Sequence, residues 1–250
     1  MVRGSSSVAT VVRQKNMRIL GLIPARGGSK GIPRKNIKLL DGKELIRYSI
    51  EIGLRCEGLD EIMVSTEDEE IAKISKAAGA SIPYLRPENL ADDKSPTIET
   101  VIHVLNYYEK QGNPFDAICL LQPTVPFRNL GDLNLVIQKF KETEADSLIS
   151  VRAVPHIYNP HWVYEEDSET GFLKMAKGGD TIIPRRQDLP KAYHRDGSIY
   201  LTKKEIILKE KSLYGKKIIH HVMKNSPNIN IDTMEDWEAA VKFAQSNFEI

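Results

Sequence analysis

The sequence has few of the features that mark disulfide-rich or membrane-spanning proteins. Its 250 residues include only two cysteines, Cys56 and Cys119, which lie among apolar neighbours and belong to no CxxC pair. This pattern excludes a disulfide framework and a thiolate zinc site, and it favours a reducing compartment. The longest apolar runs, such as residues 117–121, have the length of a strand and fall far short of the ~20 residues that a bilayer requires. The composition therefore predicts a soluble, cytoplasmic protein without a membrane partner.

An excess of charge of one sign is also lacking. The 35 Lys and Arg residues face 34 Asp and Glu residues, so the formal net charge is +1, which argues against nucleic acid as a general partner. The first 40 residues nevertheless contain no Asp or Glu, and their cations gather in one short segment: Arg26, Lys30, Arg34, Lys35 and Lys38. Cations concentrated in this way predict an anionic ligand.

Patterns typical of strands and helices alternate over the first 150 residues. Strands are expected at 19–24, 61–65, 80–84, 117–121 and 147–151, and helices at 43–56, 66–78, 97–109 and 129–143. Thr66 and Glu69 form a predicted capping box, and Asn129 or Asp132 is expected to cap the fourth helix. This alternation predicts an α/β fold, a mostly parallel sheet with helices on both faces.

The alternation breaks between residues 153 and 195, where proline, glycine and aromatic residues occur without a helical period. A stretch of this length is too long for an ordinary loop, and we interpret it as a β-rich arm used for dimer contacts. Strands at 198–201 and 218–223 and helices at 203–209 and 234–247 are expected to follow, the last helix being capped by Thr233 with Asp236. Residues 1–16 are interpreted as a disordered lead-in or a cloning remnant, with a transit peptide as the weaker alternative.

The first predicted strand runs into a basic, glycine-rich loop, ARGGSKGIPRKN, over residues 25–36. Ligands of parallel α/β sheets bind at the carboxyl ends of the strands, and glycines let backbone N–H groups approach phosphate oxygens. The loop matches neither the Walker pattern nor GxGxxG. We therefore predict phosphate binding here, against the alternative of a solvated basic turn.

Two further segments, one after the fourth predicted strand and one after an alternating apolar pattern, carry candidate site residues. Residues 120–129, LLQPTVPFRN, present Gln122 and Thr124 in a turn stiffened by two prolines; a merely rigid turn, with Arg128 as a surface charge, is an equal alternative. Residues 228–237 place Asp232 where a carboxylate can ligate Mg²⁺ beside phosphates. Taken alone, Asp232 is more often the N-cap of the following helix. The histidines lack the spacing of metal ligands and are interpreted as structural or surface residues.

Taken in order, several segments resemble those of the acylneuraminate cytidylyltransferase family: IPARGGSKGIPRKNI, VSTEDEEIA, RPENLA, LLQPTVPFR, RRQDLPKAY, DGSIY and NINIDTMED. The resemblance spans residues 18 to about 245. It implies a three-layer Rossmann-like nucleotidyltransferase domain over residues 17–250, with 153–195 as an inserted dimerisation arm, and a homodimer. It also implies an Mg²⁺-dependent reaction of CTP with a nine-carbon α-keto acid sugar, whose anomeric hydroxyl attacks the α-phosphorus to give a CMP-sugar and pyrophosphate.

The same resemblance implies roles for individual residues. The implied catalytic residues are Arg26, Lys35, Gln122 and Asp232, and Asp232 with Asn230 would hold Mg²⁺. The implied nucleotide-binding residues are Arg26, Gly28, Ser29, Lys30, Lys35, Asn36, Arg86 and Thr97. The implied acceptor-sugar residues are Gln122, Thr124, Arg186 and Tyr200, of which Arg186 lies on the arm and is expected to reach a neighbouring subunit's site.

The sequence departs from the family pattern in three places. Asn230 stands where the family often has Asp, Asp196-Gly197-Ser198 stands where it often has Asn-Gly-Ala, and His194 stands where an Arg is expected. The lost charge at residue 230 predicts weaker metal binding. A carboxylate at residue 196 beside an anionic acceptor is unfavourable unless it pairs.

These departures predict an acceptor other than N-acetylneuraminate, such as a legionaminic-type acid. Two alternatives of other classes remain open. One is a glycosyltransferase that uses a ready-made nucleotide sugar, although no Asp-x-Asp clamp follows the fourth predicted strand. The other is a catalytically silent nucleotide-binding protein on the same fold.

Overall fold

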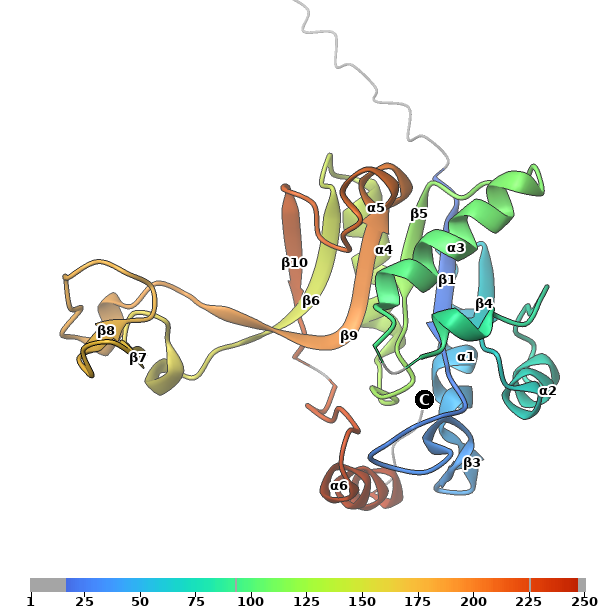
Figure 1. The fold of residues 1–250 in the computed structure, drawn as a ribbon, viewed down its shortest axis with the longest axis horizontal. Helices are drawn as coiled ribbons and strands as arrows, with labels where there is room; N and C mark the ends of the chain where they lie inside the picture. The colour runs from blue at the N-terminus through green and yellow to red at the C-terminus, as the bar shows by residue number, and fades with distance from the viewer. Residues whose placement is uncertain (1–16, 93, 225, 247–250) are drawn as a thin grey trace, which may run out of the picture.

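A computed structural model describes residues 17–92, 94–224 and 226–246, so the predictions for residues 1–16 and for Asn247 lie outside the described residues. Its central sheet has six strands in the order β10-β6-β9-β5-β1-β4 (Figure 1). These strands are β1 (Ile19–Pro24), β4 (Glu61–Ser65), β5 (Ala117–Leu120), β6 (Ser147–Ala153), β9 (Tyr193–Lys203) and β10 (Ile218–Val222). Only β9 runs antiparallel to its neighbours, β5 and β6, so the predicted mostly parallel sheet is confirmed.

Helices cover both faces of this sheet because the side chains of its strands alternate between two apolar clusters. Ile19 and Ile23 of β1 pack with apolar residues of α1 (Leu45–Arg55), α2 (Glu69–Ala77) and α4 (Leu130–Lys141). Leu20 and Leu22 point to the other face and pack with α3 (Thr97–Lys110) and α5 (Lys204–Glu210). The three-layer arrangement inferred from the sequence is therefore present.

The last helix, α6 (Met234–Gln245), lies at the end of the sheet beside the short hairpin of β2 (Leu39–Leu40) and β3 (Lys43–Glu44) (Figure 1). Trp237 and Ala240 of α6 share a third apolar cluster with Ile32, Leu40 and Phe127. Ile32 belongs to the basic loop that follows β1, so α6 packs against this loop and supports it. The predicted capping box of Thr233 and Asp236 is confirmed.

Two predictions of local structure are wrong. The N-cap of α2 is Asp68, whose carboxylate accepts a hydrogen bond from the backbone of Ile71 at 2.9 Å, rather than Thr66. Thr66 is fully buried at the end of β4, so the helix begins later than the capping pattern suggests. Residues 80–84 form no strand; Ser81 makes one isolated bridge to Met63, and Pro83 lacks the N–H that a longer ladder needs.

Residues 153–195 leave the sheet between β6 and β9 and project far from it (Figure 1). Their regular structure is a short antiparallel hairpin of β7 (Tyr164–Glu166) and β8 (Leu173–Met175), with 3₁₀ turns at η3 (His156–Tyr158) and η4 (Arg186–Asp188). The last three residues of this range belong to β9, which is longer than the predicted strand at 198–201. The use of this segment in a dimer stays a prediction. None of the helices in the described ranges is long and apolar enough to cross a membrane.

Candidate active site

A cleft of about 430 Å³ lies at the carboxyl ends of β1 and β5 and beside the segment that follows β4. Four separate parts of the chain line it: the basic loop after β1, several residues between 86 and 100, residues 122–124 after β5, and Asp232 before α6. The predicted site residues that line this cleft are Arg26, Ser29, Lys30, Lys35, Asn36, Arg86, Thr97, Gln122, Thr124 and Asp232. Segments far apart in the sequence therefore meet where ligands of parallel sheets bind.

Four predicted site residues are not among the residues that line the cleft. Gly28 lies in the basic loop with open space around its Cα. The side chain of Asn230 donates a hydrogen bond to Asp232 Oδ2 at 2.8 Å. Tyr200 packs with the apolar cluster of α3 and α5, and its burial raises the pKa of the phenol. Arg186 lies on the arm, in a separate hollow with Tyr193.

The glycines of the basic loop are needed for close packing as well as for an open backbone. A Cβ on Gly31 would lie 2.4 Å from the backbone oxygen of Asp232, and one on Gly27 would lie 2.5 Å from Asp68 Oδ2. The backbone N–H of Gly27 donates to Glu67 Oε1 at 2.6 Å, so this N–H is already occupied. The sequence analysis explained the glycines of this loop by contact with phosphate. The structure shows that Gly27 and Gly31 are also required for close packing.

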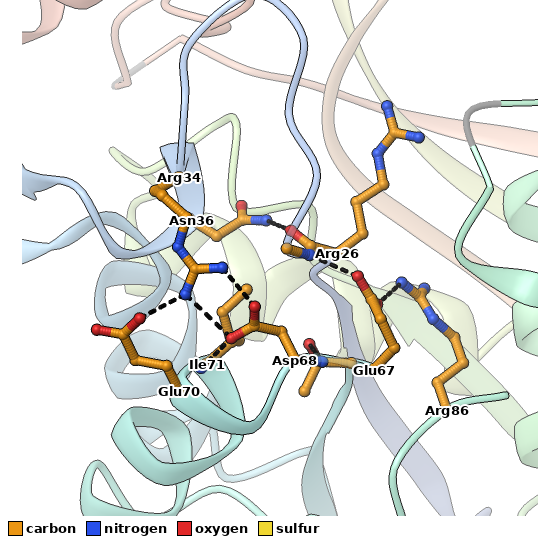
Figure 2. Close-up of polar contacts among 10 residues, drawn as sticks. Arg26, Arg34, Asn36, Glu67, Asp68, Glu70, Ile71 and Arg86 are labelled. Carbon is orange, nitrogen blue, oxygen red and sulfur yellow. Dashed lines mark hydrogen bonds and ion pairs between the residues drawn. The ribbon is translucent and has the colours of Figure 1, made fainter. Parts of the chain in front are cut away.

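Acidic residues that follow β4 hold the basic loop (Figure 2). Glu67 accepts a hydrogen bond from Arg86 Nη2 at 2.7 Å through its second oxygen, so one carboxylate joins Arg86 to the loop. Arg34 forms an ion pair with Asp68 and a second one with Glu70 at 2.6 Å. The hydrogen bond from Arg34 lowers the pKa of Asp68 below its ordinary value, despite partial burial. Part of the positive charge of the basic loop is therefore neutralised by carboxylates of the segment that follows β4.

Sequence reasoning missed the role of Glu67, although a signal was present. The first 40 residues contain no acid, whereas acidic residues follow directly after the next strand of the sheet. Because parallel strands end at the same edge, these carboxylates were bound to lie near the loop cations. The sequence analysis assigned this segment a helix cap and a place in the family resemblance, but no contact with the basic loop.

The five cations of the basic segment have different surroundings. Arg34 is held by Asp68 and Glu70, and Lys38 stacks over the ring of Trp237, 5.2 Å from its centroid. Neither lines the cleft, whereas Arg26, Lys30 and Lys35 do. Positive charge therefore enters the cleft from three of the five side chains.

The backbone of Ile231 connects the basic loop with the loop after β5. Its carbonyl oxygen accepts a hydrogen bond from Lys35 Nζ at 2.6 Å, and its N–H donates to the carbonyl oxygen of Thr124 at 2.8 Å. Lys35 Nζ also lies 3.3 Å from Asp232 Oδ1. Since Thr233 caps α6, the N-cap interpretation of Asp232 is wrong, and its carboxylate is 63% exposed at the cleft.

Arg128 is 2% exposed, so its interpretation as a surface charge is wrong. Its guanidinium donates to the backbone oxygens of Gln122 and Ser198, each at 2.7 Å, and to Ser49 Oγ at 2.9 Å. The loop that carries Gln122 is therefore held from inside the protein, rather than by the two prolines alone.

Asp196, one of the departures from the family pattern, is paired within the protein. It accepts hydrogen bonds from Ser150 Oγ at 2.5 Å and from the N–H and Oγ of Ser198 at 3.1 Å. Its side chain is 1% exposed. A carboxylate at this position was expected to be unfavourable unless it pairs, and Asp196 is paired. Asp196 is therefore not expected to repel an anionic acceptor.

Among the described residues, no group of three or more His, Cys, Asp or Glu side chains could hold a metal ion. Two of the histidines have structural partners: His221 Nε2 lies 2.9 Å from Asp132 Oδ1, and His103 Nδ1 lies 3.1 Å from the hydroxyl of Tyr84. A cation in the cleft would depend on Asp232 and on the oxygens of a bound substrate.

Comparisons with known proteins show the family of this chain. Residues 20–248 match the family described as cytidylyltransferase. The chain is 37% identical to a CMP-N,N'-diacetyllegionaminic acid synthase of Legionella pneumophila and 33% identical to a pseudaminic acid cytidylyltransferase of Campylobacter jejuni, over 93% of this chain and 99% of each relative. The structure of a CMP:2-keto-3-deoxy-manno-octonic acid synthetase complexed with CTP shares the fold, with a TM-score of 0.68 over 92% of this chain and all of that one, at 18% identity. The chain therefore belongs to the cytidylyltransferase family of nucleotidyltransferases.

Proposed function

We propose that the protein couples CTP to a nonulosonic acid and releases a CMP-sugar and pyrophosphate. The observation that carries this proposal is the cleft, in which the cations of the basic loop face Gln122 and Thr124. The names of the two curated relatives specify legionaminic and pseudaminic acids, both of which are nonulosonic acids. The chain spans 99% of both relatives, which supports an activity of the same type.

The proposed reaction needs positioning and neutralisation of charge more than a protein nucleophile. Arg26, Lys30 and Lys35 would reduce the repulsion between the triphosphate and an attacking hydroxyl, with Arg26 beside the α-phosphate. Arg86 and Thr97, with Ser29 and Asn36, would hold the rest of the nucleotide. Gln122 and Thr124 would hydrogen-bond the acceptor sugar.

Asp232, assisted by Asn230, would hold the Mg²⁺ that the family implies. The donor set fits, because Mg²⁺ usually binds one or two carboxylates together with substrate phosphates, and the exposed carboxylate of Asp232 lies at the cleft. When bound, the ion would supply charge neutralisation at the phosphate oxygens. Lys35, which contacts Asp232, would keep this carboxylate oriented toward the cleft.

A homodimer is the proposed assembly, with the arm of one subunit near the site of the other. Large apolar side chains are exposed on the arm: Ile157 by 57%, Tyr158 by 64%, Phe172 by 74%, Leu173 by 67% and Ile182 by 60%. Apolar side chains gathered in this way are typical of an interface. Arg186 on the same arm would then reach the acceptor. Light scattering coupled to size exclusion tests this assembly, and a monomer would contradict it.

The proposed acceptor is a legionaminic-type acid. Pyrophosphate release is to be measured with CTP and Mg²⁺ and a panel of legionaminic, pseudaminic, Kdo and N-acetylneuraminic acids, with ATP, GTP and UTP as controls. We expect turnover with CTP and the highest kcat/KM for the legionaminic acid. A higher kcat/KM for N-acetylneuraminate would contradict the acceptor, and silence of the folded protein with every acid would contradict the proposed reaction.

The second candidate is a catalytically silent nucleotide-binding protein, and Asn230 is the observation that favours it. The test is Asn230→Asp, which restores the charge that the family often has. A large gain in turnover in this variant would support the view that the natural protein is catalytically silent. Comparable turnover in both proteins would support the proposed cytidylyltransferase activity.

A further inference from the structure

Arg128 is a buried cation next to the part of the cleft assigned to the acceptor. Its three hydrogen-bond acceptors belong to different segments: Ser49 to α1, Ser198 to β9, and Gln122 to the loop after β5. A guanidinium is a rigid planar fork, so three separate acceptors fix its orientation. Removing its charge or its shape would release all three segments together.

Asp196 is linked to Arg128 through one shared residue, and its carboxylate also pairs with Arg152, whose Nε lies 3.6 Å from Asp196 Oδ2. Ser198 accepts a hydrogen bond from Arg128 with its carbonyl oxygen and donates to Asp196 with its N–H and its hydroxyl. Burial lowers the pKa of Arg128 to about 10, while the Cys119 thiol and Asp196 act in the opposite direction, so the guanidinium stays charged at neutral pH. The charge of Asp196 thus supports a buried cation, and the carboxylate faces away from the solvent.

The backbone of Gln122 is the point at which this network reaches the cleft. Its carbonyl oxygen accepts from Arg128 Nη2 and also from the N–H of Val125, at 3.2 Å, which closes the turn. Gly197 (φ +80°) lies on the other side, where a Cβ would be 3.8 Å from Gln122 Oε1. Arg128 therefore holds the backbone of Gln122, and the side chain of Gln122 lies near the glycine that follows Asp196.

We propose that Arg128, with Asp196 as its counter-charge, is a positioning residue that sets Gln122 for the acceptor sugar. This inference rests on the proposed function for the identity of the acceptor. Arg128 makes none of its hydrogen bonds to the basic loop, which is instead held by Glu67, Asp68 and Ile231. The network therefore acts directly on the acceptor side, and it reaches the basic loop only indirectly, through the backbone of Thr124 and Ile231.

Arg128→Lys is the principal variant, because lysine keeps the charge but cannot reach three acceptors. With N,N'-diacetyllegionaminic acid as the probe, we expect the KM for the acid to rise roughly tenfold, since a charged hydrogen bond of this kind is lost. The KM for CTP should change less, because none of the three hydrogen bonds goes to a residue assigned to the nucleotide. Asp196→Asn should raise the KM for the acid by less, because the shape of the side chain is kept.

Ser49→Ala is the matched control. It removes one acceptor of Arg128 but leaves the bond to Gln122, so it should lower the Tm without changing the KM for the acid. If Arg128 were only structural, Arg128→Lys would lower kcat through loss of folded protein and leave both KM values unchanged. That result would overturn the proposal.

Hydrogen exchange of the Val125 amide tests the same proposal without turnover. We expect faster exchange of this amide in Arg128→Lys than in the wild type, and unchanged exchange in β1. Unchanged exchange at Val125 in a folded variant would overturn the positioning role. If the wild type turned over no acid, the proposed function would fail, while this comparison would still decide whether Arg128 holds Gln122.

Discussion

Lys35 Nζ donates a hydrogen bond to the backbone oxygen of Ile231 at 2.6 Å, although 196 residues separate the two in the sequence. The same ammonium group lies 3.3 Å from Asp232 Oδ1 and lines the cleft. One cation therefore fixes the segment that carries the carboxylate and also adds charge to the site. This double role makes Lys35 the loop residue whose loss should cost the most.

Lys35→Met should lower kcat/KM by about a hundredfold, because the loss of one preorganised cation at a phosphoryl-transfer site has an effect of this order. Pyrophosphate release with CTP measures it. Lys38→Met is the matched control, since Lys38 lies on the same loop but stacks on Trp237 outside the cleft. Equal losses in the two variants would show that only the net charge of the loop matters.

Glu67→Gln should raise the KM for CTP roughly tenfold, because Arg86 loses a charge-assisted hydrogen bond while the shape of the partner is kept. The KM for the acceptor should not change, since the hydrogen bonds of Glu67 within the described residues go to Gly27 and Arg86. Glu70→Gln serves as the control, because its carboxylate is 63% exposed and pairs with Arg34. A KM for CTP that Glu67→Gln leaves at the wild-type value would contradict the bridging role.

Much of the fold could be predicted because its signals are local. The alternation of Ile19 and Ile23 with Leu20 and Leu22 already describes a strand buried on both faces, and the structure places these pairs in two clusters. The capping box of Thr233 and Asp236 is equally local. The prediction of a strand at 80–84 was wrong because pairing of this segment depends on its fit to the neighbouring β4, which its own sequence does not describe.

The residues of the site could be predicted from the sequence, but the hydrogen bonds that join its segments could not. The basic loop and Gln122 each follow an apolar run, which is enough to place them at one edge of a parallel sheet, whereas β10 ends at Val222 and the described residues between it and Asp232 form no strand. The backbone bonds of Ile231 and the burial of Arg128 depend on packing between distant segments. No pattern within either segment indicates them, and Arg128 therefore looked like a surface charge.

Gly31→Ala tests the close approach of the basic loop to Asp232. The added Cβ would lie 2.4 Å from a backbone oxygen, which cannot move as a flexible side chain can. Overpacking of this kind should lower the Tm by roughly 3–10 °C. Gly28→Ala is the control for stability, since a Cβ there meets open space. A Tm for Gly31→Ala equal to that of Gly28→Ala would show that the loop can relax away from Asp232.

Asp68→Asn separates the ion pair with Arg34 from the cap of α2, because Asn is as good an N-cap as Asp. The hydrogen bond from Arg34 lowers the pKa of Asp68 below its ordinary 3.8, so the carboxylate binds fewer protons in the folded state than in the unfolded one. Its contribution is therefore fully present above pH 4 and is lost as the pH falls through the lowered value.

Urea unfolding at pH 7 and at pH 3 measures this contribution. At pH 7 we expect Asp68→Asn to lower the free energy of unfolding by about 0.5–1 kcal/mol, a modest value because Arg34 is partly exposed to solvent. At pH 3 the difference from the wild type should be smaller, and Asp68→Ala should cost a further ~1 kcal/mol at both pH values, because it also removes the cap. Equal stability of Asp68→Asn and the wild type at both pH values would place the stabilising effect of Asp68 in its cap alone.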